Sequence, residues 1–185
     1  MKELVSAFGI PIYEKEGFEA DDCVGTLAKQ AEGLDVETII VTGDSDTLQL
    51  VNPHTKVFTM RRGIKDTVLY DEAGVEEKYG FTPKQLVEYK GLAGDSSDNI
   101  PGVTGVGPKT ATDLIARFGN LEGIYGHLDE VPAKLRERLE RDKDQAFLSR
   151  DLGTIKCDVS VTLSLDAAKL DDYDRNVAEA LLAPV

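Results

Sequence analysis

The amino-acid sequence predicts an α/β fold with a parallel sheet, joined to a second half that is mostly helical. An amphipathic pattern at residues 20–31 is followed by a short β-branched run at residues 36–41, a succession typical of a parallel α/β sheet. Beyond residue 72 most apolar residues recur at helical spacing. With 185 residues, 41% of them hydrophobic, the chain can bury a substantial core as one body. Within it we expect an α/β region at 1–90 and a helical region at 91–185.

The first residues predict two helices separated by an extended segment. A short helix ends near Gly9, and residues 10–13, which include a proline, are expected to be extended. Apolar residues spaced i, i+3, i+4 and i+7 predict a helix over residues 20–31, and Gly33 ends it.

The strands of the predicted sheet come next along the chain. Residues 36–41 are nearly continuous in apolar character, as expected for a strand that is covered on both faces. A helical turn follows through residues 48 and 50. Residues 56–60 and 67–70 then predict a hairpin across the basic turn at 61–65.

The second half is expected to be a series of helices. Thr82 and Pro83 form a cap and a first-turn proline, and Gly119 is a stop signal. Residues 157–163 alternate like an extended strand. The helical patterns cover residues 72–79, 82–92, 108–118, 121–128, 133–139, 144–152 and 174–182.

Charge and composition exclude several classes of protein. The net charge of −13 opposes unspecific adhesion to polyphosphates, so any nucleic-acid contact must rest on local basic groups or metal ions. The two cysteines, Cys23 and Cys157, lack the spacing of a zinc site or a disulfide framework, which favours a reducing, cytoplasmic setting. The apolar runs are too short to span a bilayer, so we expect no membrane association.

Three groups of acidic residues lie where predicted elements begin or end. Each group alone has a local explanation, because acidic side chains cap helices and close turns. The groups are Glu19, Asp21 and Asp22 at the start of the helix at 20–31, Asp44 and Asp46 after the strand at 36–41, and Asp95 and Asp98 after a helix end.

Together the three acidic groups favour a metal site. Their seven carboxylates have no accompanying His or Cys, and sites made only of oxygen ligands select Mg²⁺ or Mn²⁺ over zinc. So many carboxylates repel one another unless cations lie among them. Two such ions are a recurrent means of hydrolysing phosphodiesters, because one activates the attacking water and the other stabilises the leaving oxygen.

A glycine-rich stretch at residues 100–111 runs directly into the predicted helix at 108–118. Backbone N–H groups at such a helix start, beside Lys109, form a phosphate site, and turned-out carbonyls of a glycine-rich backbone can hold a monovalent cation. A tight turn between helices without a ligand is the alternative. The sequence Gly-Val-Gly-Pro-Lys-Thr-Ala favours contact with a DNA backbone.

Three segments resemble, in order and spacing, the 5′ nuclease domain of bacterial DNA polymerase I and its free-standing flap-endonuclease relatives. They are G-F-E-A-D-D at 17–22, T-G-D-S-D at 42–46 and G-D-S-S-D-N-I-P-G-V-T-G-V-G-P-K-T-A at 94–111. The resemblance covers nearly the whole chain. It implies a PIN-like α/β nuclease fold with a helix-three-turn-helix that grips the duplex behind the cleavage site.

The resemblance also implies roles for individual residues. Asp21, Asp44 and Asp46 would be catalytic, and the whole acidic set would hold two Mg²⁺ or Mn²⁺ ions, with a K⁺ ion at the glycine-rich hairpin. The metal ligands would be Glu19, Asp21, Asp22, Asp44, Asp46, Asp95 and Asp98. The residues in contact with DNA would be Gly102, Gly105, Gly107, Lys109, Thr110 and Arg117.

In members of this family a further N-terminal portion precedes the region that this sequence resembles. It supplies the first strand with a metal-binding Asp, another Asp and a basic helical arch. Its loss is expected to expose an apolar sheet edge and to remove phosphate-binding cations. The basic residues of the sequence include Arg61, Arg62, Lys65, Lys109, Arg117 and a series at residues 134–143. In that series basic and acidic residues alternate, so we expect it to form a solvated face whose charges pair with one another.

The leading hypothesis is a structure-specific 5′-3′ nuclease that cuts DNA at flaps, nicks or 5′ ends in replication and repair. Its specificity would come from duplex shape, and a DNA polymerase or a complementary N-terminal nuclease chain would be its partner. One alternative is a non-catalytic DNA-binding remnant, and another is half of a split nuclease that a separate chain completes. A PIN-type ribonuclease is a further alternative, which the glycine-rich hairpin disfavours.

Overall fold

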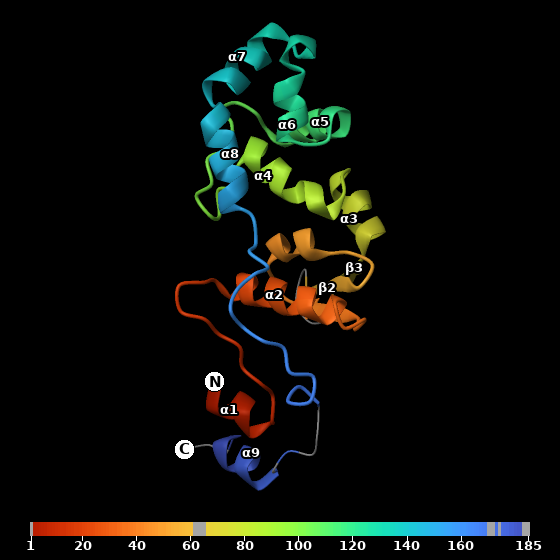
Figure 1. The fold of residues 1–185 in the computed structure, drawn as a ribbon, viewed down its shortest axis with the longest axis vertical. Coiled ribbons are helices and arrows are strands. Elements are labelled where there is room, and N and C mark those ends of the chain that lie inside the picture. The colour runs from red at the N-terminus through yellow and green to blue at the C-terminus, as the bar shows by residue number, and fades with distance from the viewer. Residues whose placement is uncertain (1, 61–65, 170–172, 174, 183–185) are drawn as a thin grey trace. The chain divides into compact units, whose positions relative to one another are not determined.

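The structure, a computed structural model, describes residues 2–60, 66–169, 173 and 175–182. The chain divides into two compact units, the first made of residues 1–31 and 156–185 and the second of residues 32–155. Figure 1 shows the order of their elements. The basic turn with Arg61, Arg62 and Lys65 lies outside the described residues. The expected division into residues 1–90 and 91–185 stays a prediction.

The first unit carries helices where the sequence predicts them. They are α1 (Lys2–Ala7), α2 (Ala20–Glu32) and α9 (Arg175–Leu182). Gly9 follows α1 with a φ of 69°, a left-handed conformation that glycine adopts without strain. The rings of Phe8 and Tyr173 lie edge to face with centroids 4.7 Å apart, which ties the end of α1 to the segment that precedes α9.

The segment at residues 157–163 does not form the expected strand, so that expectation is wrong. No strand is assigned at residues 10–13 or 157–163. In the second segment a side chain of α2 takes the place of a neighbouring strand. The amide of Gln30 donates to the carbonyl oxygen of Val161 at 2.8 Å and accepts from the N–H of Leu163 at 2.8 Å. The backbone is therefore satisfied without a ladder.

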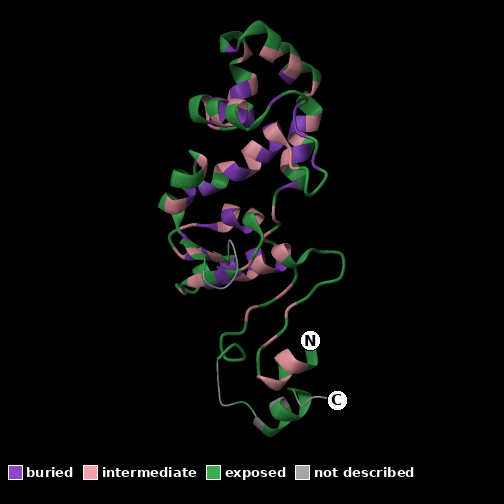
Figure 2. Cartoon of the chain, turned by 180° about the vertical axis from the view of Figure 1, so that it is seen from behind, coloured by how far each residue is buried: buried purple, intermediate pink, exposed green. Residues whose placement is uncertain are grey.

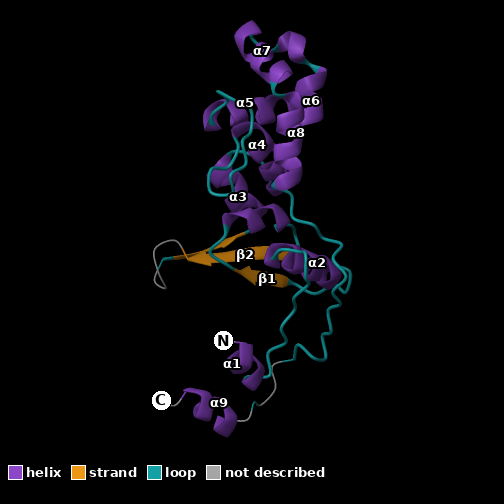
Figure 3. Ribbon diagram, turned by 90° about the vertical axis from the view of Figure 1, so that its left-hand side faces the viewer, coloured by secondary structure: helices purple, strands orange, loops and turns teal. Residues whose placement is uncertain are grey.

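The second unit contains a small mixed sheet. Its strand order is β1 (Thr38–Val41), β2 (Thr55–Met60) and β3 (Thr67–Tyr70). Strands β1 and β2 are parallel, as predicted, and β2 and β3 form the predicted antiparallel hairpin (Figure 3). Ile40, Val57 and Tyr70 stand opposite one another and are buried, so one face of the sheet lies against the core.

The other face of the sheet is open, which corrects the expectation that β1 is covered on both faces. Ile39 is 55% exposed and Val41 is 68% exposed, and Met60 and Leu69 on the neighbouring strands are 47% and 49% exposed. Among the described strands β1 pairs only with β2, so one of its edges is also free. We call these four residues the open sheet face. The exposed apolar edge that the resemblance implied is present.

Helices make up the rest of the second unit, and their bounds agree closely with the expected ones. Many of the buried residues lie on them, as Figure 2 shows. None of the described helices combines the length and the apolar character that crossing a bilayer requires. The elements are η1 (Ser45–Leu50), α3 (Glu72–Tyr79), η2 (Pro83–Gln85), α4 (Leu86–Ala93), α5 (Pro108–Phe118), α6 (Leu121–Gly126), η3 (Leu128–Glu130), α7 (Ala133–Arg141) and α8 (Lys143–Leu152).

A close backbone contact follows α4 and shapes the loop that carries two of the acidic residues. Gly102 has a φ of 61°, and a Cβ atom there would lie 2.2 Å from the nitrogen of Gly94. Between these glycines, Asp95 and Ile100 exchange two backbone hydrogen bonds of 2.8 Å. The loop is thus closed at its base by a contact that only glycine permits.

We expect Gly102→Ala to lower the free energy of unfolding by more than about 2 kcal/mol, because the new methyl group combines a left-handed φ with a backbone clash. Urea unfolding followed by circular dichroism measures the loss. Gly126→Ala is the matched control, since a Cβ atom at Gly126 would meet nothing within 4 Å. Equal stabilities of the two variants would contradict the role of this contact.

Candidate functional site

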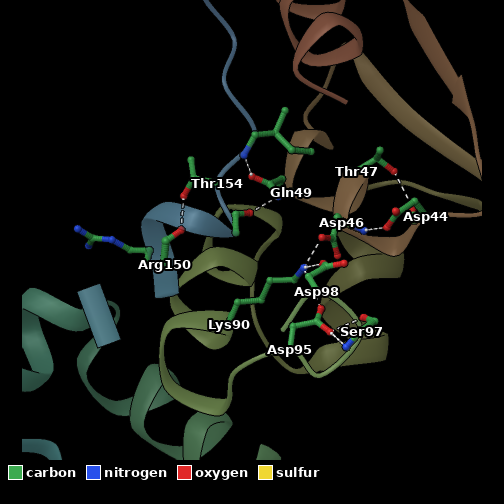
Figure 4. A network of polar contacts seen from close by, with 12 residues as sticks. Asp44, Asp46, Thr47, Gln49, Lys90, Asp95, Ser97, Asp98, Arg150 and Thr154 are labelled. Atoms are coloured by element: carbon green, nitrogen blue, oxygen red, sulfur yellow. Dashed lines mark hydrogen bonds and ion pairs between the residues drawn. The ribbon is translucent and has the colours of Figure 1, made fainter. Parts of the chain in front are cut away.

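Three of the predicted metal ligands lie together in the second unit. Asp46, Asp95 and Asp98 each place a carboxylate oxygen within 4.8 Å of the others. Asp46 comes from the first turn of η1, which follows β1, and the other two come from the loop after α4 (Figure 4). We call these three residues the acidic cluster.

Asp44 has a local structural task beside the cluster. Its side chain caps η1 by accepting from the N–H of Asp46 at 2.9 Å, and its own N–H donates to the hydroxyl of Thr42 at 3.0 Å. The carboxylate of Asp44 is not one of the three oxygens of the cluster, although its charge contributes to raising the pKa of Asp46. Its role as a metal ligand stays a prediction.

Lys90 lies at the centre of the acidic cluster. Its ammonium pairs with Asp46, with Asp95 at 2.9 Å and with Asp98 at 3.5 Å. The lysine side chain is only 5% exposed, because α4 buries this position between the loop and the core. Sequence reasoning missed this residue. The signal that could have found it is a lysine four residues after Leu86, on the apolar face of the predicted helix.

Burial and neighbouring charges shift the pKa values of the cluster in opposite directions. Burial raises the pKa of Asp46, and the ion pair with Lys90 opposes that rise. Burial also acts to raise the pKa of Asp95, but hydrogen bonds from Ser97 and Lys90 outweigh it and bring the pKa to about 2. For Lys90 burial disfavours the ammonium, yet its bonds to the carboxylates prevail and raise its pKa. The lysine is therefore charged at neutral pH.

The donors of the acidic cluster fit a hard divalent cation. Three carboxylate oxygens, with no nitrogen or sulfur among them, suit Mg²⁺ or Mn²⁺. The side chain of Asp98 is 51% exposed, so the cluster is open to solvent on one side, where a phosphate oxygen could approach. Three carboxylates face a single ammonium, so the cluster as a whole is negatively charged and attracts cations.

The remaining predicted ligands, Glu19, Asp21 and Asp22, belong to the first unit. They lie at the N-terminal turn of α2, where Asp22 accepts from the N–H of Glu19 at 3.2 Å and from the N–H of Lys156 at 2.8 Å. The bond to Glu19 stabilises the helix start, and the bond to Lys156 ties α2 to the segment after residue 155. The assignment of these three residues to a shared metal site stays a prediction.

The glycine-rich hairpin precedes α5 and is held in place by the helices α7 and α8. A guanidinium N–H of Arg138 donates to the carbonyl of Gly105 at 2.8 Å, and the N–H of Thr104 donates to Asp142 at 2.8 Å. Most charged residues of the series at 134–143 are exposed, and Arg141 pairs with Asp142 within it, as expected for a solvated, self-paired face. The contacts of Arg138 and Asp142 with the hairpin were not expected. Sequence reasoning missed Arg138 and Asp142 as hairpin supports, because nothing local distinguishes them from their charged neighbours.

The predicted DNA-contact residues differ in their surroundings. Gly107 caps α5, Lys109 is exposed in its first turn, and Thr110 is half-buried. Arg117 donates to the backbone carbonyl of Glu130 at 3.2 Å and pairs with its carboxylate, so it is engaged within the chain. Among the described residues Lys109 forms no ion pair. It is the better placed of the two cations for a phosphate.

Two family models match the chain in succession. Residues 1–80 match the 5′-3′ exonuclease N-terminal resolvase-like domain, and residues 81–176 match the 5′-3′ exonuclease C-terminal SAM fold. The chain is 45% identical over 182 residues to DNA polymerase I of Bacillus caldotenax and 46% identical over 184 residues to that of Chloroflexus aurantiacus. These matches cover 98% of this chain but 21% and 20% of the relatives, so it spans about a fifth of their length.

Solved structures confirm the PIN-like α/β fold. A mutant of T5 5′-exonuclease superposes with a TM-score of 0.65 at 25% identity, over 80% of this chain and 58% of that chain. The catalytic core of Rad2 in complex with a DNA substrate gives a TM-score of 0.55 at 26% identity, over 85% of this chain and 55% of that chain. T5 5′-exonuclease with bound zinc has the same fold, with a TM-score of 0.68 at 23% identity, over 92% of this chain and 59% of that chain.

We expect Asp142→Asn to lower stability at neutral pH, with a loss that shrinks as the pH falls below about 4. The Arg141 guanidinium and the N–H of Thr104 hold the pKa of Asp142 below its ordinary range. A lowered pKa contributes stability above the unfolded value, and that contribution disappears as the folded carboxylate is protonated.

Urea unfolding at pH 7 and at pH 3.5 measures this loss. Asp144→Asn, at an exposed carboxylate in the first turn of α8, is the control. A difference from the unsubstituted chain that is the same at both pH values would contradict a charge-based support of the hairpin.

Proposed function

Because this chain belongs to the 5′-3′ exonuclease family, we propose that it hydrolyses DNA phosphodiesters at 5′ flaps, nicks or ends in replication and repair. The observation that carries the proposal is the acidic cluster of Asp46, Asp95 and Asp98. The T5 exonuclease and the DNA-bound Rad2 core among its structural neighbours support the same substrate class. The activity of this chain by itself is part of the proposal.

Each part of the cluster has a defined task in such a reaction. Asp46, Asp95 and Asp98 would hold Mg²⁺ or Mn²⁺, and bound ions of this kind lower the pKa of an attacking water and stabilise the leaving oxygen. Asp44 fixes the first turn of η1 and so orients Asp46. The exposed side at Asp98 admits the scissile phosphate. The resemblance also assigns metal-binding roles to Asp44 and to Glu19, Asp21 and Asp22, and we keep these roles as proposals.

The hairpin and the start of α5 would bind the phosphate backbone of the duplex. Lys109 supplies a cation beside the N–H groups of the first turn, and the exposed Gly105 and Gly107 would let the duplex approach the backbone closely. Gly102 is buried against Gly94, so it would act by shaping the hairpin. These contacts read shape and charge, so selection would depend on the form of the junction. We also propose a K⁺ ion at the hairpin. Its ligands would be carbonyls other than that of Gly105, which accepts from Arg138.

The polymerase partner is a proposal from the relatives. The chain corresponds to about a fifth of DNA polymerase I, in which the matched part is joined to further regions of the same protein. A polymerase that extends a 3′ end displaces 5′ flaps, which is the substrate proposed here. Such a polymerase would therefore supply this nuclease with its substrate.

A second candidate function is half of a split nuclease that another chain completes. The free edge of β1 and the open sheet face favour it, because an added strand would pair with the edge and cover the apolar residues. The cluster would then be in place before the site is complete. A DNA-binding remnant without catalysis differs from this candidate in needing no second chain.

We expect the chain to cut a 5′-labelled flap duplex in the presence of Mg²⁺ or Mn²⁺. The Asp44→Ala plus Asp46→Ala double variant should cut it at least about a hundredfold more slowly, because this variant loses the metal ligand Asp46 and the Asp44 cap that orients it. Gel analysis of the labelled products measures the rate. EDTA should abolish cutting, and Asp129→Ala, at an exposed carboxylate of η3, should not change it.

Other outcomes of this assay identify the competing functions. Flap binding that Lys109→Ala weakens, without any cutting, would leave the DNA-binding remnant or the split nuclease. Faster cutting of single-stranded RNA than of the flap would contradict the DNA-nuclease proposal in favour of a PIN-type ribonuclease.

The split-nuclease candidate predicts concentration-dependent association through the open sheet face. We expect sedimentation at raised salt to show association that Val41→Lys reduces, because a lysine on the edge strand opposes pairing and apolar contact. Leu148→Lys, at a leucine of α8 that is 55% exposed, is the matched control. Association that Val41→Lys leaves unchanged would count against a pairing role for this face.

A further inference from the structure

We propose that Lys90 is a built-in cation of the acidic cluster, which a divalent ion must displace in order to bind there. The inference rests on the proposed function, since it assumes that the cluster binds metal. It adds a competitor to the site, and it makes Lys90 a positioning residue that sets how tightly the metal is held.

The geometry places the ammonium where the ion would sit. Its nitrogen lies 2.9 Å from an oxygen of Asp95 and 3.5 Å from one of Asp98, and it also pairs with Asp46 (Figure 4). These are the same three residues whose oxygens lie within 4.8 Å of one another. Mg²⁺ would lie at about 2.0–2.1 Å from each ligand oxygen, in the space between them. Oxygens that lie within 4.8 Å of one another leave too little space between them for both cations.

The stem of Lys90 is fixed by packing, so the ammonium is held in the cluster. The side chain is 5% exposed, and a Cβ atom added at Gly153, just after α8, would lie 3.0 Å from its Cδ atom. An ammonium that leaves the cluster must therefore change the rotamers of a packed chain and lose its partners. Metal would bind only the fraction of molecules in which it has left, which weakens the apparent affinity.

The charges give Lys90 a second effect in the absence of metal. Without its ammonium, Asp46, Asp95 and Asp98 would repel one another across a partly buried site. Lys90 thus holds the ligands in place in the metal-free protein and competes with the ion that the ligands are arranged to bind. Removal of the lysine should lower metal-free stability and raise metal affinity.

A different arrangement makes the opposite prediction. If the ion bound beside the lysine, Lys90 would remain among the carboxylates and only keep them ordered. Its removal would then loosen the ligands and weaken metal binding. The sign of the change in affinity therefore separates displacement from a merely structural role.

The test is Mn²⁺ binding to the full chain without DNA, measured by electron paramagnetic resonance of free Mn²⁺. We expect Lys90→Met to bind Mn²⁺ at least about tenfold more tightly, and to gain more in melting temperature from Mn²⁺ than the unsubstituted chain gains. Lys56→Met is the matched control, because Lys56 pairs with Glu37 on the sheet, away from the cluster. Unchanged or weaker binding by Lys90→Met would overturn the proposal.

A second measurement uses the unsubstituted chain and stays valid if Lys90→Met fails to fold. In nitrogen-15 spectra of the lysine side chains, the buried ammonium of Lys90 should give a protected signal that Mg²⁺ abolishes, while that of Lys56 is unaffected. A Lys90 signal that persists at saturating Mg²⁺ would overturn displacement. Flap cutting tests the proposed function separately, so a chain that cuts the flap but keeps this signal refutes only the role of Lys90.

Discussion

The repulsion among three carboxylates held within 4.8 Å of one another is the constraint on which the second unit depends. Two separate elements bring these groups together, η1 after the parallel strand β1 and the loop after α4. A positive charge between the carboxylates relieves the repulsion that these elements would otherwise have to overcome. The α4 helix supplies that charge from a buried position, which explains why a lysine occurs on the apolar face of this helix.

The same stretch of chain links the acidic cluster to the glycine-rich hairpin. The contact between Gly94 and Gly102 closes the loop of Asp95 and Asp98, and the hairpin begins directly at Gly102. From the other side, Ser149 of α8 accepts from the N–H of Gly102 at 3.0 Å. The groups proposed to hold metal and those proposed to hold the duplex thus share one anchoring contact, between Gly94 and Gly102.

Much of this fold could be predicted from local patterns. Glycines and caps such as Gly33, Thr82 and Gly119 mark helix ends, and the acidic cluster follows from carboxylates at element boundaries. The surroundings of the extended segments could not be predicted. Whether a face of β1 is buried, and which groups form hydrogen bonds with residues 157–163, depend on residues distant in sequence. Lys90, Arg138 and Asp142 were missed for the same reason. Each is a charged residue whose partner is at least 33 positions away or in another element.

The open sheet face has a consequence for the behaviour of the chain in solution. The edge of β1 that pairs with none of the described strands, beside exposed Ile39 and Val41, is a template for growth by successive strand addition, the route to insoluble fibres. The net charge of −13 acts against that route, because copies with the same strong charge repel one another before their edges can meet. The same negative charge that opposes binding to a polyanion thus keeps copies of the chain apart. Salt at physiological concentration screens charges beyond about 8–10 Å and therefore weakens this protection against aggregation.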